Sequence, residues 1–493
     1  MSLLVEYTDP RWRGLNMRAL AVDQAYMYLR SEYGEPSYLY TLSDECYTCP
    51  YTKVKALPAA GSGQQLEPLQ LSTEYALNFK IFQHDQGRYA HENVSALCWL
   101  RRTDLQEFGV YNLTLLPNGT CDFAVDKPGV PINYAFLSVF VLVAAVLILL
   151  KLGSCAWRCY RYDEAAAAAD SIGAAATKAT QRKRLRSLDT FRGLSIVLMI
   201  FVNSGGGGYA WIEHAAWNGL HLADLVFPFL PVDRRSWHRA IYRCLELNRE
   251  RAQLLAEISS YPGVPFNLRG PVSPRGYSHP GGKHDQGAHS NCTPGAAGYV
   301  DMQVEGNAHI YPASHSQLCV RLPVPSIRRE SFGCLLSIVQ VLLGAFAGLT
   351  LLVHTTWQTR LRRWLLLSLL LGVVGGALCG FSREGGVIPV NKNLWSLSFV
   401  FVTVSVALLL LALLYYIIDV RDGWWSGWPF SECGMNAIIM YVGHSVLHKM
   451  LPWHWRLGPM NTHFVLLLES TWNTLLWVGI ALYLDAHEFY YSL

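Results

Sequence analysis

The pattern of apolar and polar positions divides the chain into two parts. Residues 1–130 alternate short apolar and polar stretches, for example Tyr75–Phe82 and Gly109–Leu115. That alternation is typical of strands that bury one face. Much of residues 333–485 consists instead of apolar runs long enough to match the roughly 20 residues that cross a bilayer as a helix. The pattern therefore predicts a small β-rich domain followed by membrane-spanning helices.

Seven apolar runs predict membrane spans, and the basic residues between them predict their orientation. The runs lie at about Ile132–Leu150, Gly193–Val202, Cys334–Val353, Trp364–Phe381, Leu394–Ile418, Met435–Leu451 and Thr471–Leu484. Lys and Arg cluster in 151–187 and in 355–363, so the positive-inside rule assigns both segments to the cytosol. The N-terminal region then faces the lumen or the exterior.

The predicted fold class is a polytopic α-helical membrane protein with a small β-rich luminal N-terminal domain. The predicted divisions are a luminal β-rich domain (1–131), a first span (132–151), a cytosolic basic linker (152–187), a second span with a luminal histidine loop (188–230), an atypical segment with a luminal loop (231–332) and a five-span helical bundle (333–493). Residues 231–270 combine an arginine run with a downstream luminal signal, so no chemistry is assigned to them. Residues 1–30 hold no signal-peptide core, and we expect the true start to lie upstream.

Composition and modifiable residues agree with a luminal N-terminal region. Charged residues make up 15% of the chain, against about 25% in ordinary globular proteins, and the net charge of +4 is too small to favour nucleic-acid binding. Acceptor sequons for N-glycosylation begin at Asn93, Asn112, Asn118 and Asn291.

Four cysteines of this region, Cys46, Cys49, Cys98 and Cys121, form an even set that allows three disulfide pairings. The alternative for Cys46-x-x-Cys49 is half of a zinc site or a redox motif. No second Cys-x-x-Cys or His pair follows, so the pattern favours disulfides and predicts no metal site.

Polar residues are densest from Ser187 to Pro228. Asp189 and Arg192 are three positions apart, so they share a helix face and are expected to pair. Asn203 precedes four glycines, which allow a sharp turn or the close approach of a ligand. His214 follows that turn, and an imidazole there is suited to act as a general base or a nucleophile. The alternative is a histidine with no role beyond an exposed loop.

Several stretches resemble the heparan-α-glucosaminide N-acetyltransferase family. They are Arg186–Gly193, the Asn203–glycine run, His214–Pro228, Ile388–Ser396, Gly434–His444, the Asn291 sequon with Gly295–Asp301, and parts of the N-terminal region around Val22-Asp-Gln-Ala. The motifs are long, occur in the family's order and cover roughly 390 residues, leaving out 231–270 and scattered loops.

This resemblance implies a lysosomal membrane enzyme that acetylates the terminal glucosamine of heparan sulfate with acetyl-CoA from the cytosol. His214 falls on the family's catalytic histidine and Asn203 on the asparagine that assists it. The resemblance also implies an eleven-span bundle, of which this chain lacks about four spans after Pro228. The implied partners are a heparan sulfate oligosaccharide, the lipid bilayer and a second copy in a homodimer, and no nucleic acid.

Candidate residues for the rest of the site are basic or polar residues near predicted span ends. For the phosphates of coenzyme A these are Lys183, Arg184, Arg186, Arg192, Arg360, Arg362 and Arg363, with a purely topological role as the alternative. Asn391, Lys392 and Asn393 are candidates for sugar contacts or for snorkelling at the interface. Asn436, Tyr441 and His444 are expected along one span, as a helix contact or a tunnel lining.

Two other functions compete with the acetyltransferase. One is a catalytically dead truncated variant, since the missing spans would remove walls of the cofactor tunnel. The other is a multi-span transporter that uses intramembrane His and Asn residues. Transporters usually carry internal repeats with matching broken helices, and the sequence shows no such repeat.

Overall fold

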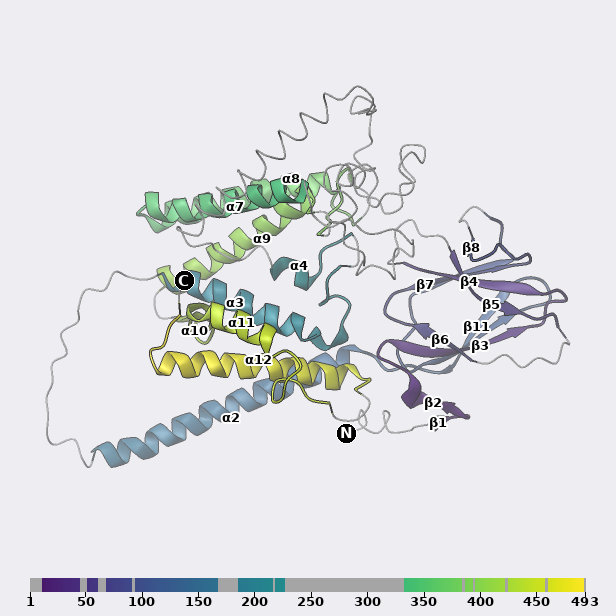
Figure 1. The fold of residues 1–493 in the computed structure, drawn as a ribbon, viewed down its shortest axis with the longest axis horizontal. Coiled ribbons are helices and arrows are strands. Elements are labelled where there is room, and N and C mark those ends of the chain that lie inside the picture. Colours follow the sequence, from purple (N-terminus) through teal and green to yellow (C-terminus); the bar gives the residue numbers. More distant parts are fainter. Residues whose placement is uncertain are drawn as a thin grey trace, which may run out of the picture.

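A computed structural model describes residues 11–44, 51–60, 68–90, 94–166, 185–215, 218–226, 332–383, 386–392, 395–421, 424–456 and 460–491. Within these residues an N-terminal β-domain stands at one end of a group of long helices (Figure 1). The predicted class, a β-rich domain followed by several long apolar helices, is therefore confirmed.

The β-domain consists of two main sheets and a small hairpin. Its strands are β1 (Arg11–Trp12), β2 (Leu15–Asn16), β3 (Gln24–Ser31), β4 (Ser37–Ser43), β5 (Tyr51–Leu57), β6 (Leu69–Ser72), β7 (Leu77–Phe82), β8 (Tyr89–Ala90), β9 (Cys98–Arg102), β10 (Val110–Leu115) and β11 (Cys121–Lys127), with a 3-10 turn η1 (Met17–Ala19). One sheet has the order β11-β10-β3-β6 and the other β8-β5-β4-β7-β9. The stretches predicted as strands became β7 and β10.

The two sheets bury their apolar faces against each other. Met27 and Leu113 from one sheet and Leu39 and Phe79 from the other belong to a single core cluster. Successive side chains of a strand point to opposite faces, so every second residue of these strands reaches that core. The domain is therefore a β-sandwich with its own hydrophobic core.

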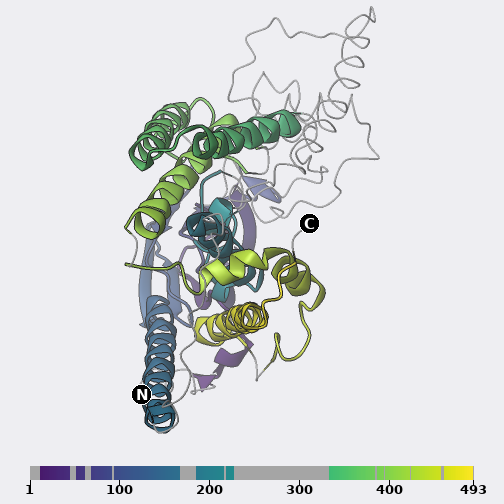
Figure 2. The same ribbon diagram turned by 90° about the vertical axis from the view of Figure 1, so that its left-hand side faces the viewer.

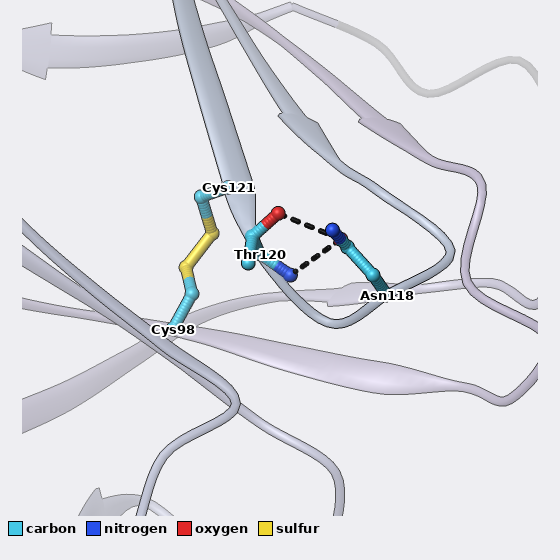
Figure 3. Close-up of a disulfide and its surroundings, with 4 residues drawn as sticks. All are labelled: Cys98, Asn118, Thr120 and Cys121. Atoms are coloured by element: carbon cyan, nitrogen blue, oxygen red, sulfur yellow. Dashed lines mark hydrogen bonds between the residues drawn. A yellow bond between two sulfur atoms is a disulfide. The ribbon is translucent and has the colours of Figure 1, made fainter.

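A disulfide joins the two sheets at their edges. Cys98 on β9 is bonded to Cys121 on β11 (Figure 3). The pairing confirms a disulfide between two of the four predicted cysteines, whereas Cys46 and Cys49 lie outside the described residues. In the turn before Cys121, the Asn118 side-chain oxygen accepts hydrogen bonds from the backbone N–H and the hydroxyl of Thr120.

The remaining described residues are mainly helical. The helices are α2 (Asn133–Ala166), α3 (Arg186–Asn203), α4 (Leu222–Val226), α7 (Phe332–Val353), α8 (Trp357–Leu378), α9 (Leu397–Tyr415), α10 (Phe430–Met435), α11 (Ala437–Val446) and α12 (His463–Ala486), with a 3-10 turn η2 (Gly206–Gly208) and a π-helical turn η7 (Tyr416–Val420). The α2 helix continues well beyond the predicted first span and makes the start of the predicted linker helical.

Among the described residues four helices are long and apolar enough to cross a membrane. They are Leu336–Val353, Trp357–Leu378, Leu397–Val420 and His463–Ala486. Two shorter apolar stretches are Asn133–Val146, which is the first part of α2, and Ala437–Val446. All six coincide with runs predicted as spans. The total of seven spans stays a prediction.

Several predicted boundaries were wrong. Arg360, Arg362 and Arg363 were placed in a linker but lie in the first two turns of α8, because arginine is a good helix former. The predicted span from Met435 is instead two helices that meet at Asn436, and it ends at Val446. The α12 helix begins eight positions earlier than predicted, at His463, where Thr462 accepts a hydrogen bond from Val465 as its N-cap.

Helix α3 lies at the centre of the group and packs against α9, α10, α11 and α12 (Figure 2). Its contact with α10 depends on two glycines. A Cβ added at Gly193 would lie 1.8 Å from the carbonyl oxygen of Phe430, and one added at Gly434 would lie 1.8 Å from that of Asp189. No other residue fits such a close backbone approach. This contact fixes α3 and the loop that follows it.

Candidate active site

The loop after α3 folds back against itself and carries His214. It turns through Gly205–Gly208, all four with positive φ values that glycine adopts without strain. The backbone N–H groups of Leu222 and Ala223 then donate to the carbonyls of Trp211 and Ile212. These two bonds hold the short helix α4 beside the residues that precede His214.

His214 forms a hydrogen-bonded pair with Asp224 of α4. Its Nδ1 lies 2.9 Å from Asp224 Oδ1, and its side chain is 52% exposed whereas that of Asp224 is 0% exposed. The second carboxylate oxygen accepts hydrogen bonds from the backbone N–H groups of Ala215, at 3.1 Å, and His221, at 3.0 Å. A fixed carboxylate of this kind orients the imidazole and selects its tautomer.

The charge of Asp224 is maintained by its hydrogen bonds. Burial alone would raise its pKa, but the hydrogen bonds from His214 and His221 and the positive charge of Lys392 together lower the pKa below its ordinary value of 3.8. The carboxylate is therefore ionised in both neutral and mildly acidic solution. An ionised acceptor at Nδ1 favours the tautomer with the proton on that nitrogen and with Nε2 as the basic atom.

Lys392 completes the charged group from a distant part of the chain. Its Nζ lies 3.3 Å from Asp224 Oδ1, and 2.7 and 3.2 Å from the two ring nitrogens of His214. An ammonium can only donate, so it competes with the ring for the carboxylate, and its contact with Nδ1 itself favours the tautomer that carries the proton on Nε2. Sequence analysis placed Lys392 at a membrane boundary, and the structure brings it beside His214.

Asn391 connects the segment that carries Lys392 to the histidine loop. Its side chain is fully buried and donates to Asn218 Oδ1 at 3.1 Å. Arg383 Nε donates to the carbonyl of Asn218 at 3.1 Å, and Gly219 N–H donates to the carbonyl of Val390 at 2.8 Å. These bonds link the histidine loop to the segment before α9. Asn393 lies outside the described residues.

Asn203 contacts a different histidine from the one expected. Its Nδ2 lies 3.2 Å from Nε2 of His444 on α11, and among the described contacts none joins it to His214. The His444 Nδ1 lies 3.0 Å from the carbonyl of Met440, so Nδ1 carries the proton and Nε2 accepts from Asn203. The neighbouring Tyr441 ring lies 5.6 Å from the His444 ring, as expected for residues on one helix face.

The arginines predicted to bind coenzyme A divide into two groups. Arg360 is engaged at the end of α7, where its guanidinium donates to the carbonyls of Leu351 and His354 and to the Tyr415 hydroxyl. It therefore closes the C-terminus of α7, whose carbonyls lack partners within the helix.

The other predicted arginines are less constrained. Arg192 forms the expected pair with Asp189, at 3.7 Å. The exposed members are Arg186, Arg362 and Arg363, and Arg184 lies outside the described residues.

Asp224 was not predicted from the sequence as a site residue. Its signal was an aspartate ten positions after His214, inside the otherwise apolar stretch Leu222–Val226. A carboxylate in such a stretch requires partners. The pairing of Asn203 with His444 joins positions 241 residues apart, and no local spacing could have predicted it.

A β-sandwich followed by several helices long and apolar enough to cross a membrane is the architecture of a multi-pass membrane protein, and the loop after one helix carries a histidine–aspartate pair. Comparison with known proteins gives a more specific class. The chain is 30% identical to heparan-α-glucosaminide N-acetyltransferase of Homo sapiens over 598 positions, covering 96% of this chain and 88% of that protein. It is 29% identical to the Mus musculus protein of the same name over 595 positions, covering 96% and 89%. No family model matches the chain.

The chain therefore belongs to the heparan-α-glucosaminide N-acetyltransferase family, a family of membrane N-acetyltransferases. Each alignment runs over more positions than the 493 residues of the chain. The alignments therefore open gaps in this chain, and the relatives carry segments that it lacks.

Proposed function

We propose that the chain is a transmembrane acetyltransferase that moves an acetyl group from cytosolic acetyl-CoA to the terminal non-reducing α-glucosamine of heparan sulfate. Family membership supports the reaction class, and the relatives' names supply the acceptor. The observation that carries the proposal is the hydrogen bond between His214 and the buried carboxylate of Asp224. The lysosomal membrane is the proposed location, with the N-terminal domain in the lumen.

The proposed chemistry uses Nε2 of His214. With Nδ1 donating to Asp224, Nε2 carries the lone pair and belongs to a half-exposed side chain that substrates can reach. Asp224 stabilises the positive charge that the ring gains when Nε2 takes a proton or an acetyl group. Because its pKa is depressed, Asp224 keeps this function in an acidic lumen.

Two routes follow from this geometry. In the direct route, Nε2 removes one proton from the glucosamine ammonium and the amine attacks the thioester carbon. The carbon–sulfur bond then breaks, and the attacking nitrogen loses its second proton to the departing coenzyme A thiolate. In the covalent route, Nε2 itself attacks the thioester carbon and releases the thiolate. The amine then attacks the acetyl-imidazole, the carbon–nitrogen bond to the ring breaks, and the amine loses its proton.

Asn203 is assigned a supporting role. The pair with His444 uses an amide N–H of Asn203, and its amide oxygen has a separate acceptor capacity. We propose that His444 keeps Asn203 oriented at the end of α3, two residues before the glycine run. The Asn203–His444 pair then lies at the start of the loop, and the His214–Asp224 pair lies towards its end.

For coenzyme A, the exposed Arg186, Arg362 and Arg363 are the favoured phosphate ligands. Arg360 is less suited, because its guanidinium already binds two carbonyls and a hydroxyl. The competing proposal is a catalytically dead variant, and the alignment gaps favour it, because segments of the relatives are absent here.

The test is acetyl transfer from labelled acetyl-CoA to a glucosamine acceptor in membranes that carry the full chain. We expect activity that falls by about 100-fold or more in His214→Ala, because the variant loses the base or nucleophile. His487→Ala, an exposed histidine at the end of α12, is the matched control and should retain full activity. Absence of transfer by well-expressed wild-type chain would favour the dead variant.

The orientation of the β-domain has a separate test. Asn118 is exposed in the β10–β11 turn, whereas Asn112 is partly buried within β10. We expect Asn118→Gln to remove one glycosidase-sensitive mobility shift, and Asn112→Gln to change mobility less. A wild-type chain insensitive to glycosidase would contradict a luminal β-domain.

A further inference from the structure

A buried cluster of three metal-ligating side chains lies where the β-domain meets α12. His463 Nε2 is 3.0 Å from Asp23 Oδ1 and 3.6 Å from Glu107 Oε2, and the donor atoms of all three residues lie within 4.8 Å of one another. His463 and Glu107 have fully buried side chains, and that of Asp23 is 14% exposed. His463 and Asp23 are 440 positions apart, so the sequence pattern, which predicted no metal site, could not reveal the cluster.

The protonation of His463 is set by the glycine turn. Its Nδ1 lies 2.8 Å from the carbonyl oxygen of Gly207, which can only accept, so Nδ1 carries a proton. In the neutral ring the lone pair is then on Nε2, the atom that faces both carboxylates. Metal-bound histidines commonly donate their other N–H to a carbonyl in this way. Gly207 is required there, since a Cβ on it would lie 2.8 Å from Leu467.

The spacing of the three donors suits a small divalent cation. A lone pair and two carboxylates that converge in a buried place repel one another unless a metal cation or a proton lies between them. Zinc binds nitrogen and oxygen at about 2.0–2.2 Å in a tetrahedron, which sets neighbouring donors about 3.3 Å apart. The distances of 3.0 and 3.6 Å from Nε2 lie on either side of that value.

An adjoining cavity leaves room for a water ligand. Its volume is about 150 Å³, and Asp23 and Glu107 line it together with the polar residues Thr73, Gln106 and Asn133. A cavity of this size with several polar groups holds ordered water. Three protein donors and one water would complete four-coordinate zinc.

We propose that Asp23, Glu107 and His463 bind a zinc-class divalent cation that joins the β-domain to the helices. The ligands come from both sides of this junction, with two carboxylates from the β-domain and the imidazole from α12. Direct polar contacts there include Asn461 Nδ2 with the carbonyl of Leu20, at 3.1 Å, and the Tyr209 hydroxyl with the carbonyl of Ile132, at 2.9 Å. A cation held by both parts stabilises their docked arrangement, because it binds only the docked state.

The test uses the full chain purified in detergent without a polyhistidine tag, stripped with chelator, incubated with zinc chloride at neutral pH and desalted. Elemental analysis should find about one zinc per wild-type chain. His463→Gln and Glu107→Gln should lose it, and the matched His487→Gln should keep it. Zinc should raise the thermal unfolding temperature of wild type and of His487→Gln only.

If the wild-type chain and His463→Gln contained the same amount of zinc, the proposal would be overturned. His463 Nε2 would then be protonated and would donate a hydrogen bond to Asp23. X-ray absorption at the zinc edge of the wild-type chain gives a result that does not depend on how the variants fold. Nitrogen and oxygen ligands with one imidazole would support the site. Sulfur ligands would overturn it by placing the metal on cysteines.

Discussion

Two histidines near the ends of the α3 loop have opposite surroundings. His214 is 52% exposed and lies between the carboxylate of Asp224 and the ammonium of Lys392. His444 is 6% exposed and has neutral partners, the carbonyl of Met440 and the amide of Asn203. The half-exposed ring of His214 can exchange protons with a bound substrate. The orientation of the buried His444 ring is fixed by its two hydrogen bonds.

The family resemblance assigned His214 and Asn203 to one catalytic unit, and the structure places them in two separate hydrogen-bonded pairs, with Asp224 and with His444. At His214 the ionised, buried carboxylate of Asp224 favours positive charge on the ring, and the ammonium of Lys392 opposes it. A histidine that donates to a carbonyl and accepts from an amide is stabilised in its neutral form. His214 therefore lies among charged groups, as the proposed role of a base requires, whereas His444 lies among neutral groups and contacts Asn203.

The largest expected effect comes from Asp224→Asn. The amide keeps the shape of the carboxylate but removes the charge and can place a donor against Nδ1, which moves the ring proton to Nε2. We expect acetyl transfer to fall by about 100-fold or more, with little change in KM for acetyl-CoA. Steady-state kinetics on matched amounts of folded chain measure it. A loss below about threefold would remove the basis for treating His214 and Asp224 as a unit.

The same contrast shows how far sequence alone could lead. Strand alternation and apolar runs predicted the β-domain and the helices, because those patterns report burial directly. Helix ends were less predictable, because polar residues such as His463 and Arg360 lie inside helices. Their side chains form hydrogen bonds with backbone carbonyls outside those helices, and these bonds leave no local pattern in the sequence. Residue roles in the site depended on resemblance. Contacts between Lys392 and His214, 178 positions apart, result from folding and leave no local signal.

A smaller effect on rate is expected at His444. Replacement by Leu removes the hydrogen bond between the His444 ring and the amide of the exposed Asn203, which should lower the stability of the folded chain by about 0.5–1.5 kcal/mol. Acetyl transfer should fall by about tenfold or less, since His444 acts only through Asn203. His444→Gln offers a new acceptor and should recover much of both losses.

Thermal unfolding and kinetics on the two variants at His444 provide the measurement. If His444→Leu lost as much activity as Asp224→Asn while remaining folded, the two histidines would be equivalent and the comparison would fail. Recovery by Gln of stability but not of rate would instead assign the imidazole itself to the chemistry.

The smallest expected effect is the response of Asp224 to mild acid. Its pKa is lowered from 3.8 in the folded chain, so the carboxylate contributes stability that is fully present above that value and is lost only as pH falls through the lower folded pKa. The gap in unfolding temperature between wild type and Asp224→Asn should therefore not close between about pH 7 and about pH 5. A gap that closed over this range would mean that Asp224 takes up a proton there, and that its bonds to His214 and Lys392 do not hold its charge.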